Sequence, residues 1–260
     1  MLHLTILGSG SAGNSAVLES GGTRLLIDAG LSARRIVAGL AESGITPEQL
    51  DGVLLTHEHC DHAGGLEVLC KKWRLPIYCN PLTADALGRE RNWDWRLFTT
   101  GADFAINDVT VQTFAVPHDA ADPVGMVFHA GAASLGFLTD LGFATRLVFE
   151  RVRSAQTLVI ETNHDEKLLQ NDTKRPWSVK QRIMSRHGHL SNDAASKVVG
   201  ELLGGPLQRV ITCHLSRDCN SPELSAGTLR AHLESLGADS NALEIFCATQ
   251  AAASPRFAVA

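Results

Sequence analysis

The segment Thr56–His62 holds the densest group of metal-ligating side chains in the sequence. It reads THEHCDH and follows the apolar run DGVLL, so three histidines and an aspartate fall within six residues. His57 and His59 alternate and would point the same way from an extended chain, whereas Asp61 and His62 stand where the chain turns into the next helix. Imidazole and carboxylate ligands suit zinc, manganese and iron. The segment therefore predicts two ligand groups that could hold two divalent metal ions close together.

Three further ligand-type residues each follow an apolar, strand-like run. His118 comes after FAVP, Asp140 after GFLT, and His214 after RVITC. In α/β sheets, binding sites are built at strand ends. Each residue alone is a weak signal, because a lone histidine is more often structural. Together with THEHCDH, the three residues complete the ligand set of a dinuclear centre.

The pattern H-x-H-x-D-H, followed by a later His, a later Asp and a final His, resembles the metallo-β-lactamase fold superfamily over residues 2–250. The resemblance implies an α/β (α+β) fold, a four-layer αββα sandwich with a dinuclear site at one edge of its two sheets. The roles it implies are His57, His59 and His118 for the first metal ion, Asp61, His62 and His214 for the second, Asp140 as the bridge between them, and Asp28 as a support for the histidine loop that does not bind metal.

Several short motifs narrow the resemblance to the YycJ-like (WalJ) subgroup, whose members are DNA exonucleases. They are LGSGSAGNS, VPHDAADPVG, ETNHD, GHLSN and HLSRDCNSPEL. GHLS and HLSR also resemble the RNase Z-type nuclease branch, which implies that Glu161 and His189 assist phosphate handling. GHLS differs from the GHST of that branch, and His187 lies close enough to compete with His189 for this role.

These residues suggest hydrolysis of a phosphodiester by a metal-bridging hydroxide. Asp61 would orient the hydroxide or accept a proton while it ligates the second ion. His189, oriented by Glu161, would hydrogen-bond the phosphate or protonate the leaving oxygen. A helix cap or a surface imidazole is the other interpretation of His189.

Residues 167–186 carry six lysines and arginines against one acidic residue, Asp172, in a chain whose net charge is −5. Such a local excess could follow a nucleic-acid backbone, with Lys180 and Arg182 as contacts and Trp177 stacked on a base. The alternative is a solvated helix face with a tryptophan in the core.

Residues 8–13 read GSGSAG and match the G-x-G-x-x-G fingerprint of dinucleotide-binding proteins, with Asp28 twenty residues after the first glycine. A dinucleotide site needs a helix directly after the glycines. Here a strand, a Gly-Gly turn and a second strand follow, so NAD is not expected. We expect a tight loop between antiparallel strands, in which Ser11 and Asn14 either contact substrate or only serve the turn.

The remaining pattern predicts one layered domain over residues 1–260, in which 251–260 form a loose tail. The sequence has no signal peptide, no membrane span and no C-x-x-C pair among its six cysteines, so we expect a cytoplasmic protein with reduced thiols and no membrane partner. Strands are expected at 2–8, 15–20, 23–30, 51–59, 76–80, 104–116, 124–131, 133–142, 157–163, 209–216 and 242–249, and helices at 31–44, 62–75, 81–92, 178–188, 191–205 and 221–237.

Three functions compete at this point. A metal-dependent DNA nuclease is favoured by the ETN, GHLSN and HLSR motifs together with the local basic segment. A glyoxalase-II-like or lactonase-like hydrolase of small thioesters or lactones would use the same ligands. A non-catalytic domain that keeps the fold would have no need for all seven ligand positions.

Overall fold

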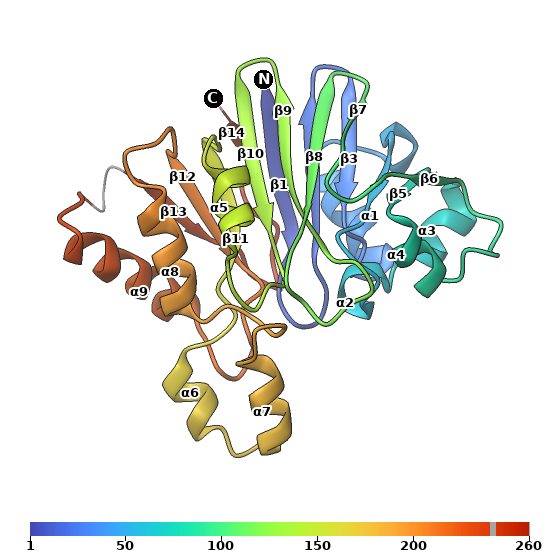
Figure 1. Ribbon diagram of the computed structural model, residues 1–260. Coiled ribbons are helices and arrows are strands. Elements are labelled where there is room, and N and C mark those ends of the chain that lie inside the picture. The colour runs from blue at the N-terminus through green and yellow to red at the C-terminus, as the bar shows by residue number, and fades with distance from the viewer. Residues whose placement is uncertain (240–242, 260) are drawn as a thin grey trace.

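Two β-sheets pack face to face in the computed structural model, which describes residues 1–239 and 243–259 (Figure 1). Each sheet has seven strands among the described residues. The first runs in the order β14 (Phe257–Val259), β1 (Leu2–Gly8), β2 (Ser15–Ser20), β3 (Thr23–Ile27), β4 (Gly52–Leu54), β5 (Ile77–Cys79), β6 (Trp95–Leu97). The second runs in the order β13 (Glu244–Cys247), β12 (Arg209–Cys213), β11 (Thr157–Glu161), β10 (Ala133–Leu138), β9 (Val124–Ala130), β8 (Val109–Ala115), β7 (Asp103–Ile106).

Helices cover the outer face of each sheet, and two more form a separate lobe (Figure 1). The first sheet is covered by α1 (Ala33–Glu42), α2 (Cys60–Ala63), α3 (Leu66–Trp73) and α4 (Pro81–Ala86), with the short 3-10 helix Pro47–Gln49 before β4. The second is covered by α5 (Arg146–Val152), α8 (Asn192–Glu201) and α9 (Pro222–Ser235). Beyond the sheet edge project α6 (Glu166–Asn171) and α7 (Trp177–Ile183), which we call the α6–α7 lobe (residues 166–183).

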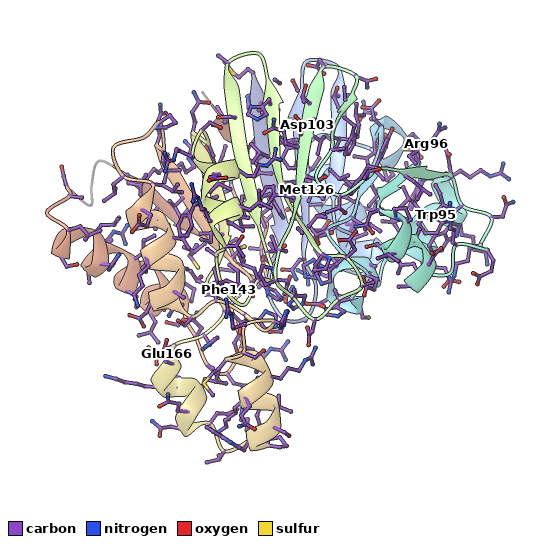
Figure 2. All side chains as sticks on the ribbon, in the orientation of Figure 1. Trp95, Arg96, Asp103, Met126, Phe143 and Glu166 are labelled. Carbon is purple, nitrogen blue, oxygen red and sulfur yellow. The ribbon has the colours of Figure 1, made fainter. Side chains whose placement is uncertain are left out.

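Three apolar clusters account for the layers. The central cluster lies between the sheets and includes Leu4, Ile27, Phe128 and Met126, the last labelled in Figure 2. The other two lie between each sheet and its helices. Sheets that are buried on both faces require strands that are apolar at nearly every position, as LLI and TLVI are here. The predicted four-layer αββα architecture is confirmed.

Strand direction decides where a site can form. Strands β1, β2 and β3 are antiparallel neighbours, so the predicted glycine loop between antiparallel strands is confirmed. Strands β3 to β6 are parallel, as are β10 to β13. Parallel strands end at the same edge of a sheet, and polar residues that follow them therefore gather there.

Some expectations about the elements were wrong. The tail is not loose, because β14 pairs with β1 in the register Leu2↔Val259 and Leu4↔Phe257, and both tail side chains are buried. Its partner lies at the other end of the chain, which a local pattern cannot reveal. The helix expected at 62–75 is split into α2 and α3 at Gly64–Gly65.

Short elements account for the other differences. The sequence did not predict α5, α6 or β6, which have three to seven residues and are too short to show a clear repeating pattern. The strand expected at 242–249 is β13, and its expected first residue, 242, lies outside the described residues. No described helix has the length and apolar character that a membrane crossing requires.

Candidate metal centre

All seven predicted metal ligands come together at the edge where the parallel strands end. Their ligand atoms fall into overlapping groups, in each of which all atoms lie within 4.8 Å of one another. The groups are His57–His59–His118, His57–His62–Asp140, Asp61–His62–His214 and Asp140–Glu161–His189–His214.

The first group consists of three imidazoles. His59 Nδ1 lies 3.3 Å from His118 Nε2. His57 Nδ1 forms a 3.0 Å hydrogen bond with Thr56 Oγ1, whereas its buried Nε2 has no hydrogen-bond partner in the described structure. Burial and the nearby His62 hold the pKa of His57 well below its usual value, so the ring is neutral, the form that binds metals.

The second group surrounds Asp61, whose Oδ2 lies 3.1 Å from His214 Nε2 and 3.6 Å from His62 Nε2. Asp140 lies between the two groups. Its Oδ2 is 2.7 Å from His62 Nε2, and its Oδ1 is 4.0 Å from His118 Nε2. Asp140 therefore occupies the place expected of a bridging ligand.

The donors fit divalent metal ions. One buried atom at the centre, His57 Nε2, has no hydrogen-bond partner among the described residues, although such atoms are almost always satisfied in native proteins. A cation bound among these nitrogens and oxygens would satisfy it. Imidazole nitrogens together with carboxylate oxygens are a donor set that suits zinc and manganese.

Asp28 is hydrogen-bonded to the histidine loop. Its Oδ1 accepts a 2.8 Å hydrogen bond from the Thr56 backbone N–H, and its Oδ2 lies 2.7 Å from His62 Nδ1. Burial lowers the pKa of His62, but the carboxylates of Asp140 and Asp28 outweigh it and raise the pKa to about 10. Sequence reasoning missed Thr56, whose hydroxyl bonds both Asp28 and His57. Its place directly before the histidine motif was the only signal.

Three of the strand-end residues adopt a left-handed backbone conformation. The φ angles are 57° at Asp28, 52° at Asp140 and 56° at His214. This region is unfavourable for residues other than glycine and costs of order 1–3 kcal/mol each, and such residues cluster at functional sites. At these positions it turns the chain sharply after β3, β10 and β12, where the side chains join the ligand groups.

Glu161 joins His189 to this centre. It is fully buried at the end of β11, and its Oε1 lies 2.7 Å from the Nδ1 atoms of both His189 and His214, while Oε2 accepts from two backbone N–H groups. Burial favours a protonated Glu161, but the charge of His189 and the two imidazole hydrogen bonds lower its pKa to about 2. His187 is exposed, so of the two competing histidines it is His189 that faces the site.

The glycine loop between β1 and β2 packs against α2, which carries Asp61. Asn14 is buried; its Oδ1 accepts from Ser9 Oγ and the Gly10 N–H, and its backbone N–H donates to the Asp61 carbonyl at 2.8 Å. Gly13 has φ 137°, and a Cβ there would lie 2.5 Å from a backbone oxygen. The expectation that Asn14 contacts substrate is therefore wrong, because its amide is used up in fixing the loop.

The basic segment divides into two kinds of residue. Lys180 is buried, and its Nζ donates to the Gln170 carbonyl at 2.9 Å, which links α7 to α6. Its expected role as a substrate contact is therefore wrong. Trp177 is 58% exposed, which contradicts a core position. Arg182 is exposed and pairs with Asp119, which adjoins His118.

The chain belongs to the beta-lactamase superfamily, because the model of the "Beta-lactamase superfamily domain" matches residues 23–214. Within it, the chain is 34% identical over 240 residues to exodeoxyribonuclease YycJ of Bacillus anthracis, covering 91% of this chain and 90% of that relative. It is 37% identical over 231 residues to exodeoxyribonuclease WalJ of Streptococcus pneumoniae serotype 2, covering 86% of each. The predicted family is confirmed.

A solved structure agrees on the fold. The metallo-beta-lactamase fold protein YhfI from Bacillus subtilis matches with a TM-score of 0.75, covering 98% of this chain and 99% of that one. The sequences are 16% identical, so this likeness supports the fold alone.

Proposed function

We propose that this protein is a metal-dependent phosphodiesterase that degrades DNA from its ends. The observation that carries the proposal is the similarity of nearly the whole chain to two exodeoxyribonucleases. The ligand groups by themselves would serve a thioesterase or a lactonase equally well.

The proposed cofactors are two divalent ions, zinc or manganese, with iron as a third candidate. His57, His59 and His118 would hold one ion, Asp61, His62 and His214 the other, and Asp140 would contact both. Two such ions lower the pKa of water and neutralise the charge that develops on a phosphoryl group.

The remaining polar groups have distinct roles in this proposal. His189 is fixed through Nδ1, and its Nε2 has no partner in the described structure, so Nε2 would donate to a phosphate oxygen or to the leaving oxygen. The Asp61 side chain is 29% exposed, against 2% for Asp140. Asp61 is thus the ligand carboxylate that reaches solvent, where it would accept a proton from the attacking water.

The α6–α7 lobe would contact the DNA strand. Exposed Trp177 offers a ring on which a base can stack, and Arg182 offers charge beside the metal centre. The six cysteines, all described, are free thiols, which suits the reducing cytoplasm as the place of action.

The test compares substrates and two aspartate variants. Purified protein is assayed for bound metal and for hydrolysis of labelled single-stranded DNA, RNA, bis-p-nitrophenyl phosphate and a thioester. We expect DNA hydrolysis in the wild type and the control Asp193→Asn, an exposed residue of α8, and its loss in Asp61→Ala. Undiminished DNA hydrolysis by Asp61→Ala would contradict the proposal, and a preference for the thioester would support the small-ester alternative.

A further inference from the structure

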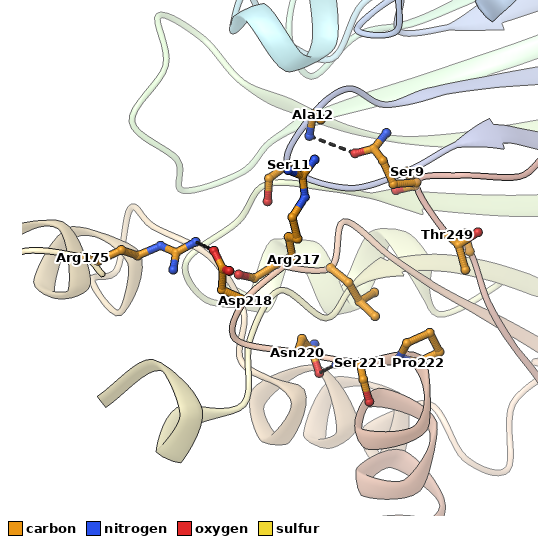
Figure 3. Close-up of a pocket in the computed structure, with 14 residues that line it drawn as sticks. Ser9, Ser11, Ala12, Arg175, Arg217, Asp218, Asn220, Ser221, Pro222 and Thr249 are labelled. Atoms are coloured by element: carbon orange, nitrogen blue, oxygen red, sulfur yellow. Dashed lines mark hydrogen bonds and ion pairs between the residues drawn. The ribbon is translucent and has the colours of Figure 1, made fainter. Parts of the chain in front are cut away.

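A cavity of about 470 Å³ adjoins the metal centre (Figure 3). Its walls come from Arg175 and from three segments that are distant in sequence: residues 9–12 of the β1–β2 loop, residues 215–222 between β12 and α9, and residues 248–250 after β13. The cavity shares a wall with the ligand His214, because Ser9 Oγ accepts the His214 backbone N–H at 2.9 Å. A molecule bound here would lie next to the loop that carries His214, although none of the seven ligands itself lines the cavity.

The two arginines of this cavity differ in what already binds them. Arg175 donates to Asp172 at 2.7 Å and to Asp218 at 3.1 Å, so its charge is compensated. Arg217 is exposed and has no ion pair or hydrogen bond to any described residue, and Figure 3 shows its side chain extending toward Ser11. Arg217 is therefore the cation that this cavity offers to a ligand.

The other lining groups supply two further kinds of contact. The hydroxyls of Ser11 and Thr249 make no hydrogen bond within the described structure and lie in the lining. Leu215, Pro222 and Ala248 supply apolar surface. One free guanidinium, two free hydroxyls and an apolar wall match a phosphate, a sugar and a base, and the volume falls in the range of about 300–1,000 Å³ typical of small-molecule sites.

We propose that this cavity binds the terminal nucleotide of the DNA strand, with a phosphate at Arg217 and the base against Leu215 and Pro222. The proposal rests on the proposed exonuclease function, because an enzyme that works from an end must hold that end beside the bond it cleaves. The cavity would thereby place the next phosphodiester at the ligand groups.

The test measures binding to the metal-loaded protein by calorimetry, with a deoxynucleoside monophosphate and the matching deoxynucleoside as probes. Arg217→Gln is compared with the control Arg230→Gln. Arg230 is an exposed arginine on α9 that does not line the cavity. We expect Arg217→Gln to weaken monophosphate binding about tenfold or more and to leave nucleoside binding unchanged, because a charge-assisted contact is lost. Arg230→Gln should bind both probes as the wild type does.

Steady-state kinetics give a second readout. In Arg217→Gln, kcat/KM for single-stranded DNA should fall about tenfold while hydrolysis of bis-p-nitrophenyl phosphate is unchanged. Equal monophosphate affinity in Arg217→Gln and wild type would overturn the proposal, and so would a parallel loss of bis-p-nitrophenyl phosphate hydrolysis, which would assign the arginine to the metal centre. If the wild type cleaves neither substrate, the proposed function fails, whereas the binding measurement still reports on the cavity.

Discussion

The metal centre and the α6–α7 lobe are built in opposite ways. In the centre, His57, His62, Asp140 and His214 are almost fully buried, and the imidazoles are oriented by Thr56, Asp28 and Glu161. In the lobe, the large apolar side chains are mostly exposed: Leu168, Trp177 and Val179. Leu169 is the one fully buried apolar side chain among its described residues. Under the proposed function, variants of the centre should lose hydrolysis of any diester, whereas variants of the lobe should affect only a polymeric substrate.

The most severe test of this contrast is Asp140→Asn, because Asp140 contacts both ligand groups. Losing a shared carboxylate should empty the centre and lower hydrolysis of both single-stranded DNA and bis-p-nitrophenyl phosphate by about 10³-fold or more, since activation of water at neutral pH depends on the metal. Metal analysis should show the ions lost along with both activities. Asp193→Asn serves as the control and should keep both. If Asp140→Asn retained hydrolysis of the small diester, the assignment of Asp140 to the metal centre would be wrong.

Glu161→Gln should have the next largest effect. The substitution keeps the shape of the side chain but removes the charge that orients His189 and His214, and losing such an outer partner typically costs about 10–100-fold. We expect kcat to fall by that amount for both substrates. Glu42→Gln, at the exposed end of α1, should behave as the wild type.

A double substitution tests whether Glu161 acts by orienting His189 or by stabilising the site in general. If Glu161 acts by holding His189, then Glu161→Gln with His189→Gln should be little worse than His189→Gln alone. Losses that multiply would mean that Glu161 acts through His214, its other imidazole partner, and not through His189. Thermal melting of all three variants controls for destabilisation of the buried site.

Trp177→Ala tests the other side of the contrast. Stacking of a base on an aromatic ring is worth about 1–3 kcal/mol, so affinity for single-stranded DNA should fall roughly 5–150-fold. Hydrolysis of bis-p-nitrophenyl phosphate should not change, and the free energy of unfolding should change by no more than about 0.5 kcal/mol, because the ring is largely exposed. Leu236→Ala, an exposed apolar residue after α9, is the control. If Trp177→Ala bound DNA as tightly as the wild type, Trp177 would not contact the substrate.

The sequence predicted those features that depend on residues close together in the chain, and it missed those that depend on contacts between distant residues. The ligands were predictable because THEHCDH is compact and because His118, Asp140 and His214 each follow an apolar run that forms a strand. The backbone at Asp140 and His214 is left-handed, which is unfavourable for residues other than glycine, so the local sequence pattern did not predict it.

Side-chain orientation in the shorter segments was beyond local reasoning. Lys180 and Trp177 lie in one seven-residue helix, and only the contact between α7 and α6 decides which of them is buried. Arg217 is the last residue of the HLSR motif, yet what sets it apart is that it has no partner among the described residues, and that is a property of the folded structure.

The smallest effect is expected at the junction between the two regions, where Arg182 of the lobe pairs with Asp119 beside His118. The Arg182 side chain is 63% exposed, and exposed ion pairs contribute about 0–1 kcal/mol, so Arg182→Gln should barely change the melting temperature. If Arg182 also contacts a phosphate, the substitution should lower DNA affinity a few-fold and reduce the slope of log affinity against log salt by about 0.7. Arg146→Gln, which breaks a similar exposed pair with Glu150 on α5, should leave that slope unchanged. A slope that stays the same in Arg182→Gln would mean that this arginine only fastens the lobe to the metal centre, and that stacking on Trp177 would have to hold the strand without it.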